Sequence, residues 1–282
     1  MGAAMAQRLM NVGHEVTVWN RSPEKTMPLA EAGAKVAGTP RELAAGSELV
    51  ITILTDAAAI EATYGGDSGL LAGDVKGKLF VEMSTVRPEA EEKLAATVKA
   101  KGAALVDCPV GGSTAPARDG KLFGFAGGED ADVARAKPVL DQLCRRVEHV
   151  GPTGAGARMK LAINLPLLVY WQAMGEALYI IKSLNLDPAR VIDILADTSG
   201  GPNVLKSRGP ALVAALQGKE ITPVTFDVDS IRKDLRTMIE EGRALGAELP
   251  VTALALACFD EASNDGLGSK DASVLPATFA QK

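Results

Sequence analysis

The sequence predicts an α/β domain followed by an all-helical domain, with one long helix joining the two. Strand and helix signals alternate through the first half of the 282 residues, which is typical of a parallel sheet. After the glycine-rich segment at 151–156 one helical pattern runs from Ala157 to about Leu184, and little strand signal follows. A chain of this length is also near the size at which a single core divides. We expect the domains to be residues 1–152 and 153–282.

Short runs of β-branched and aliphatic residues predict the strands of the first domain. The expected strands are residues 15–20, 35–36, 49–54, 79–83, 104–107, 122–126 and 147–150. The run at 49–54 is almost continuously apolar, which indicates a strand covered on both faces. Expected helices lie at 3–10, 23–32, 39–45 and 88–101, and Ser22 is a reasonable N-cap for the second of them.

The second half reads as helices separated by glycine and proline signals at 200–202 and 221–224. Its most apolar stretch, residues 161–181, contains Asn164, Pro166 and Glu176, so a buried helix fits better than a membrane span. Trp171 and Tyr179 on this helix are expected in the core or at a dimer interface.

The amino-acid composition of the chain excludes some classes of function. The formal net charge of −5 argues against a general nucleic-acid binder, which would carry a basic stripe. The three cysteines, Cys108, Cys144 and Cys258, are far apart and have no metal-ligand spacing, so we expect no metal site and a reducing, cytoplasmic location. Both histidines lie beside strands, and neither is assigned a catalytic role.

The start of the chain resembles the middle of a dinucleotide-binding (Rossmann) motif. Such a motif begins with a strand, a Gly-x-Gly-x-x-Gly turn and a helix that faces the pyrophosphate. Here Gly2 already opens a helix, and the next strand ends at Asn20, close to the roughly 20-residue separation from the ribose-contacting position. We therefore expect Gly2 to be the third glycine, with one strand and two glycines upstream of Met1. The alternative is an ordinary amphipathic helix.

The residues that end this strand indicate the cofactor. NAD-binding domains usually carry Asp or Glu there, whereas this chain has Asn20, Arg21 and Ser22. A guanidinium beside a hydroxyl can bind the 2′-phosphate of NADP, and no carboxylate repels it. NADP is therefore the expected cofactor, with NAD possible. A solvated arginine in a turn is the alternative.

Two further motifs indicate chemistry. Gly111, Gly112 and Ser113 are small residues whose backbone N–H groups can hold a substrate carboxylate, although a plain turn has the same composition. Lys160 and Asn164 lie four residues apart, on one face of the long helix. A lysine on an apolar helix is costly unless it faces a polar cleft, and a lysine that reaches solvent is the alternative.

Taken together these segments resemble the β-hydroxyacid dehydrogenase family over nearly the whole chain. The motifs that carry the resemblance are residues 1–22, Asp107–Ser113, Gly154-x-Gly-x-x-x-Lys160-x-x-x-Asn164 and Lys233-Asp-Leu. The resemblance implies that Lys160 is the general acid/base and that Asn164 orients the substrate. It also implies a cofactor cleft lined by Leu54, Thr55, Thr85 and Lys233, and a homo-dimer or homo-tetramer.

The implied reaction interconverts a small β-hydroxyacid and its semialdehyde or oxo acid. Two departures from the family pattern concern the substrate and cofactor loops: Gly111 replaces a usual serine, and Thr55 replaces a frequent proline. An imine reductase of the same architecture is an alternative, although such enzymes usually lack the lysine. A non-catalytic NADP-binding or oligomerisation module is the other alternative.

Overall fold

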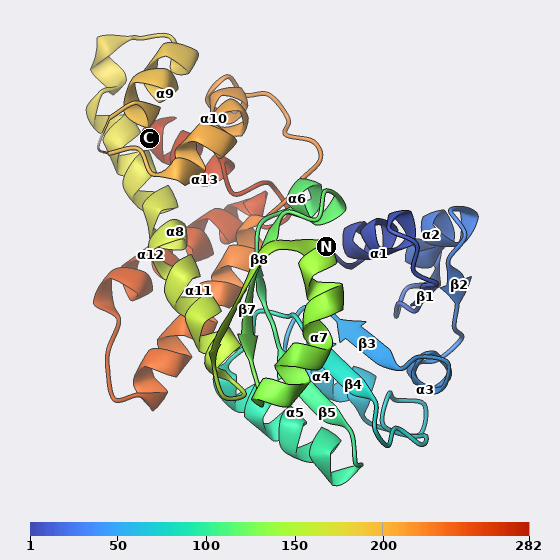
Figure 1. Cartoon of the computed structure of the whole chain (residues 1–282). Coiled ribbons are helices and arrows are strands. Elements are labelled where there is room, and N and C mark those ends of the chain that lie inside the picture. Colours follow the sequence, from blue (N-terminus) through green and yellow to red (C-terminus); the bar gives the residue numbers. More distant parts are fainter. Residues whose placement is uncertain (199, 282) are drawn as a thin grey trace. The chain divides into compact units, whose positions relative to one another are not determined.

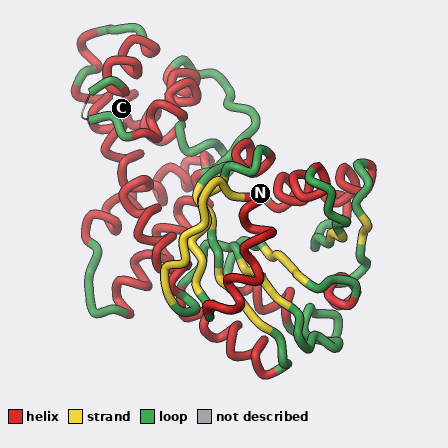
Figure 2. The backbone as a smooth tube through the Cα atoms, in the orientation of Figure 1, coloured by secondary structure: helices red, strands yellow, loops and turns green. Residues whose placement is uncertain are grey.

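The computed structural model describes residues 1–198 and 200–281 of the chain (Figure 1). These residues form two compact units, Met1–Leu161 and Ala162–Lys282. All eight strands within the described residues belong to the first unit, and the second is built from helices (Figure 2). An α/β domain followed by an all-α domain is thus confirmed. The predicted boundary at residues 152 and 153 stays a prediction; it falls just before the long helix α8 (Ala155–Ile180).

The first unit alternates strands and helices. Its strands are β1 (Thr17–Val18), β2 (Lys35–Val36), β3 (Leu49–Thr52), β4 (Leu79–Glu82), β5 (Ala104–Asp107), β6 (Val110–Gly111), β7 (Leu122–Gly127) and β8 (Cys144–Gly151). Its helices before α8 are α1 (Gly2–Asn11), η1 (Pro23–Thr26), α2 (Met27–Glu31), α3 (Pro40–Ala45), α4 (Ala57–Tyr64), α5 (Pro88–Ala100), α6 (Thr114–Arg118) and α7 (Asp130–Leu143).

The main sheet is mixed, which corrects the predicted parallel sheet. Its order is β3-β4-β5-β7-β6, and β8 pairs with β7. Strands β3, β4 and β5 run parallel, whereas β7 is antiparallel to both β5 and β6. A parallel pair needs a crossover of about a dozen residues or more, usually a helix. The segment between β6 and β7 holds only the short helix α6, whereas α7 provides the crossover that makes β8 parallel to β7.

Strands β1 and β2 pair in parallel as a separate two-stranded sheet. The expected strand at 15–20 is thus shorter than predicted. Strand β3 lies at an edge of the main sheet, where Val50 and Thr52 are buried but Leu49 and Ile51 are only part-buried. Val50 belongs to one hydrophobic cluster, and Leu49 and Ile51 pack against the other, so both faces of β3 are covered, but less completely than those of β4, all of whose residues are buried.

Local capping explains several helix starts. The Thr39 hydroxyl accepts the Glu42 amide at the start of α3, and the Asp56 carboxylate accepts the Ala59 amide at the start of α4. The helix expected after Ser22 is divided into η1 and α2. Ser22 also donates its own amide to Asn20 Oδ1 (2.9 Å), which makes a turn at the end of β1.

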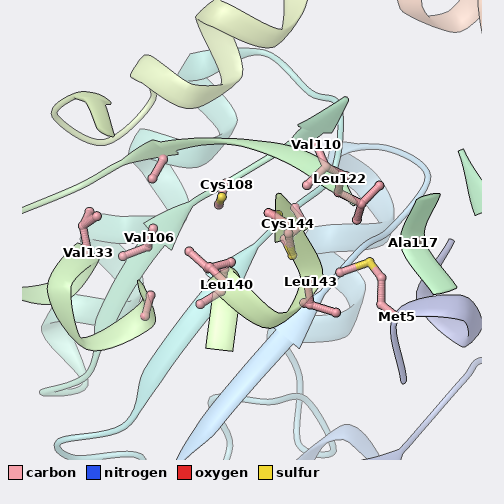
Figure 3. Packing of buried hydrophobic residues seen from close by; sticks show 14 of the residues in the cluster. Met5, Val106, Cys108, Val110, Ala117, Leu122, Val133, Leu140, Leu143 and Cys144 are labelled. Atoms are coloured by element: carbon pink, nitrogen blue, oxygen red, sulfur yellow. The ribbon is translucent and has the colours of Figure 1, made fainter. Parts of the chain in front are cut away.

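Each face of the main sheet has its own hydrophobic core. Alternate residues of β4 divide between them: Leu79 and Val81 belong to one cluster and Phe80 to the other. The first cluster includes residues of α1 and α7, and Figure 3 shows Met5, Val106 and Leu140 in it. The second cluster includes residues of α4 and α5. The parallel strands are thus sandwiched between helices, with their carboxyl ends at one edge.

The second unit contains most of α8 and seven further helical segments among its described residues. They are η2 (Lys182–Leu184), α9 (Pro188–Ala196), α10 (Asn203–Leu216), α11 (Val228–Ala244), α12 (Pro250–Ala262), the π-helix η3 (Ser263–Leu267) and α13 (Val274–Gln281). Trp171 on α8 is buried, as expected for a core residue, whereas Tyr179 is half exposed. Among the helices described, none has the length and hydropathy that crossing a membrane requires.

Leu140 provides a test of the first core. Leu140→Ala removes a side chain with 0% exposure from the contact of α7 with the sheet. It should lower the free energy of unfolding by about 2–5 kcal/mol, through lost burial and the cavity left behind. Urea denaturation followed by circular dichroism measures this change. The matched control, Leu254→Ala at a site that is 71% exposed, should stay within about 0.5 kcal/mol of wild type. Equal effects of the two substitutions would contradict this description of the core.

Candidate active site

The loops after β3 and β4 meet at the carboxyl edge of the sheet. Thr52 and Glu82, the last residues of these strands, are paired in register. Two residues beyond them, the Leu54 amide donates to Ser84 Oγ (2.7 Å), which joins the loops directly. Thr55 is exposed and Thr85 is part-buried. In open α/β sheets ligands bind outside the carboxyl ends of the strands, so these loops are where a dinucleotide would lie.

The start of α1 fits a dinucleotide as well. A Cβ atom added to Gly2 would lie 3.2 Å from Ile53 Cγ2, closer than side chains normally pack. The third glycine of a dinucleotide motif serves this close contact of helix and strand. Gly2 therefore meets the geometric requirement that the sequence pattern suggested, and the helix N-terminus provides a partial positive charge.

Asn20, Arg21 and Ser22 follow β1. Asn20 and Arg21 are exposed, and Ser22 is part-buried. The hydrogen bond from the Ser22 amide to Asn20 Oδ1 fixes the turn on which Arg21 stands. A guanidinium on a fixed, solvent-facing turn is suited to an anionic ligand.

The predicted substrate loop lies between β6 and α6. Gly111 is the last residue of β6 and pairs with Phe123 of β7, so it belongs to a strand and not to a free loop. Gly112 is exposed, and Ser113 occupies the position before the first residue of α6. The expected small, accessible segment is therefore limited to the two residues after Gly111.

Asp107, which the sequence analysis did not single out as functional, holds the start of α8. This last residue of β5 is fully buried. Its Oδ1 accepts the Gly154 amide (2.8 Å), and its Oδ2 accepts the Ala157 amide (2.9 Å). A carboxylate here offsets the partial positive charge of the helix N-terminus. Burial raises the pKa of Asp107 to about 6, and the donating amides oppose this increase.

The glycines of the long-helix motif have a steric purpose. A Cβ atom on Gly156 would collide with the Phe125 carbonyl oxygen of β7 and approach the Asp107 carboxylate. Only glycine lets the first turn of α8 pack this closely on the sheet. The position of α8, and therefore of Lys160 in its second turn, is set by this contact.

Lys160 and Asn164 are both buried, with 8% and 6% of their surfaces exposed. Their spacing of four places them on one face of α8. Asn164 Nδ2 donates to Asp234 Oδ2 (3.5 Å), and Asp234 Oδ1 pairs with Lys233 Nζ (2.5 Å). Two residues predicted separately, Asn164 and Lys233, are thus connected by Asp234 of α11. This role of Asp234 was not predicted from the sequence, although Asp234 lies inside the Lys-Asp-Leu motif.

The described residues contain no cluster of His, Cys, Asp or Glu that could hold a metal ion. His149 contacts the Gly128 and Gly151 carbonyl oxygens through Nε2, and His14 contacts Gln142, so both hydrogen-bond within the first unit. Cys108 and Cys144 are buried, and burial raises the pKa of each thiol, which makes them unreactive.

Family models match both halves of the chain. The model for the NAD binding domain of 6-phosphogluconate dehydrogenase matches residues 1–151. The model for the NAD-binding segment of NADP-dependent 3-hydroxyisobutyrate dehydrogenase matches residues 154–277. The fold and these matches define an NAD(P)-dependent oxidoreductase.

Similarity to individual proteins identifies the family within this class of oxidoreductases. The 3-hydroxyisobutyrate dehydrogenase of Pseudomonas aeruginosa is 33% identical over 95% of this chain and 92% of its own length. Glyoxylate/succinic semialdehyde reductase 1 of Arabidopsis thaliana is 32% identical over 98% of this chain and 93% of its own. The structure of Psf3 in complex with NADP⁺ and 2-OPP superposes with a TM-score of 0.87 and 26% identity, covering 99% of this chain and 96% of Psf3. This chain belongs to the β-hydroxyacid dehydrogenase family, as its motifs predicted.

The pH dependence of stability tests Asp107. Its pKa is about 6 in the folded protein and 3.8 as the ordinary value, so the folded state favours the protonated form. The corresponding contribution to stability is present below about pH 4 and is lost as the pH rises through 6, on the order of 2–3 kcal/mol. Asp107→Asn cannot titrate. The unfolding free energy of wild type minus that of Asp107→Asn should therefore fall between pH 4 and pH 7. A difference that stays constant over this range would contradict the assignment.

Proposed function

We propose that this protein is an NADP(H)-preferring oxidoreductase that interconverts a small β-hydroxyacid and its semialdehyde or oxo acid. The observation that carries this proposal is the buried pair of Lys160 and Asn164 on one face of α8. Burying a lysine costs free energy unless polar groups surround the ammonium, and such lysines are common at functional sites. In a family of NAD(P)-dependent oxidoreductases the function of such a lysine is proton transfer.

In the direction of reduction, Lys160 Nζ donates a proton to the carbonyl oxygen of the substrate. In the direction of oxidation, the neutral amine accepts the hydroxyl proton. A bound nicotinamide supplies or accepts the hydride. Asn164 orients the reacting oxygen toward Nζ, and Asp234 fixes the Asn164 amide through the hydrogen bond described above. The protein thus positions a proton donor beside a small, polar reacting group.

The proposed substrate carries a carboxylate. The two relatives are named for 3-hydroxyisobutyrate, glyoxylate and succinic semialdehyde, all of which are small carboxylates. Backbone N–H groups at Gly111, Gly112 and Ser113 are the proposed carboxylate donors. Because Gly111 is engaged in the pairing of β6 with β7, Gly112 and Ser113 are the better placed of the three.

The proposed cofactor preference rests on the turn after β1. Arg21 is exposed there, and neither neighbour is acidic, so a 2′-phosphate meets attraction without repulsion. Gly2, Leu54, Thr55 and Thr85 are the proposed contacts for the remainder of the dinucleotide in the first unit. Lys233 is the proposed contact from α11.

Lys160→Ala tests the chemical step. Loss of the proton donor should lower kcat for NADPH-dependent reduction of glyoxylate or succinic semialdehyde by about 10²–10⁴-fold. The Kd for NADPH, measured by isothermal titration, should change little. Lys99→Ala, at an exposed position of α5, is the matched control and should keep wild-type turnover. Wild-type protein that reduces imines but none of these carbonyl compounds would overturn the proposed reaction.

Arg21→Ala tests the cofactor preference. Loss of a charge-assisted hydrogen bond should raise the Kd for NADPH by about 10–100-fold and leave that for NADH nearly unchanged. Lys25→Ala, which removes an exposed positive charge from the same stretch, controls for general electrostatics. Parallel weakening of NADPH and NADH binding, or equal effects of the two substitutions, would argue against a 2′-phosphate contact at Arg21.

A further inference from the structure

Two glutamates lie buried behind the loops that the proposed function assigns to the cofactor. Glu82 is the last residue of β4, and Glu91 is on α5; both have 0% exposure. The two side chains are neighbours, and the negative charge of Glu82 raises the pKa of Glu91. No basic side chain forms an ion pair with either of them in the part of the chain that the structure describes. A pair of buried carboxyl groups without a cation is costly if both are charged.

The donors around the pair show which group is the carboxylate. Glu82 Oε2 accepts the Ser84 amide (2.8 Å), and Glu82 Oε1 accepts the Ser84 hydroxyl and, more weakly, the Thr52 hydroxyl (3.4 Å). Neither oxygen of Glu91 has a hydrogen-bond donor among the described residues. Two carboxylates cannot hydrogen-bond to each other without a proton. The contact is therefore a hydrogen bond only when one group, Glu91, is protonated and donates to Glu82.

We propose that Glu91 keeps a proton and donates it to Glu82, and that this carboxyl pair positions the loops after β3 and β4 for the cofactor. The proposal rests on the proposed function to the extent that these loops bind a dinucleotide. Both glutamates are positioning residues, because they act on the cofactor only through Ser84 and the backbone.

Hydrogen bonds connect the pair to the two loops. The Ser84 hydroxyl donates to Glu82 and accepts the Leu54 amide (2.7 Å), so one carboxylate orders a residue two positions beyond each strand. On the other side, Thr52 Oγ1 lies 2.8 Å from the Tyr64 hydroxyl of α4. A Tyr64 hydroxyl that donates to Thr52 leaves the Thr52 proton for Glu82. All the hydroxyl groups then point toward one negative charge.

The groups around Glu82 and Glu91 favour a state in which only one of the two carboxyl groups is charged. The groups that face Glu91 are Glu82 from β4, Asp107 from β5 and Tyr64 from α4, and none of them is basic. Burial, followed by the negative charges of Glu82 and Asp107, raises the pKa of Glu91 well above its ordinary value. Because the pKa is raised on folding, the contribution of the pair to folding and loop order is fully present below the ordinary pKa of a glutamate. It is lost as the pH rises through the folded-state pKa.

Three variants distinguish the effect of the Glu91 proton from the effect of the volume of its side chain. Glu91→Gln keeps the shape and provides a permanent N–H donor to Glu82. Glu91→Leu keeps approximate volume but provides no donor. Glu92→Gln, at the exposed neighbouring position of α5, is the matched control.

The first readout is the proton itself, and it does not depend on activity. The infrared spectrum of the full chain at neutral pH should contain the carbonyl-stretching band of a protonated, buried carboxylic acid. The band should be absent from Glu91→Gln and present in Glu92→Gln. A spectrum without this band in wild type, or with the same band in Glu91→Gln, would overturn the shared proton.

The second readout is loop order and cofactor binding. Amide hydrogen exchange at Leu54 should be about tenfold faster in Glu91→Leu than in Glu91→Gln, and the Kd for NADPH should be about tenfold higher. The Kd of wild type should increase with alkaline pH, whereas that of Glu91→Gln should stay flat. Identical pH profiles for wild type and Glu91→Gln would overturn the positioning role. Wild-type protein that shows the proton and the Leu54 protection but binds no NADPH would refute the proposed function and leave the pair as the anchor of the two loops.

Discussion

The contact between the Asp107 carboxylate and the first turn of α8 is the constraint on which the proposed catalytic geometry depends. The carboxylate ends β5, a parallel strand inside the sheet, and accepts two amides from the start of the helix. It therefore ties the helix that carries Lys160 to the strand edge at which the loops proposed to bind the cofactor begin. Burial opposes the charge of Asp107, and the helix dipole and amides favour it. The anchor is strong only because glycine at 156 lets the backbone come this close.

A second acidic anchor, Glu82, follows the same logic one strand away. Both residues are the last of their strands, and they pair in register across β4 and β5. Each accepts backbone amides and so fixes a segment that leaves the sheet: α8 from Asp107, and the loop at Ser84 from Glu82. Buried carboxylates serve here as fixed acceptors that are less mobile than water. Their proximity also explains why a third acid, Glu91, is expected to stay neutral.

The sequence predicted what depends on neighbours along the chain, and the failures involve distant contacts. The helix at 39–45, the limits of β5 and the Lys160–Asn164 spacing are local, and the structure agrees with them. Helices α4 and α7 were not predicted. The mixed sheet was not predicted because the direction of its strands is set by the pairing of β7 with β5 and β6. Glu91 stands among charged residues of an amphipathic helix, and its sequence context is that of a solvated side chain. Only the position of α5 on the sheet buries it.

This arrangement divides the tasks of the proposed enzyme among elements that can change independently. The residues proposed to select the cofactor, Asn20 to Ser22, are on an exposed turn held by local hydrogen bonds, from the Ser22 amide to Asn20 Oδ1 and from the Lys25 amide to the Ser22 carbonyl oxygen. A substitution there has few buried partners to disturb. By contrast, Ser84 and Asp107 each hold two segments at once, so a change at either moves a loop or helix as well as a contact. Cofactor preference should therefore vary among proteins of this architecture more readily than the placement of the proton donor, because the first depends on surface chemistry and the second on buried acceptors.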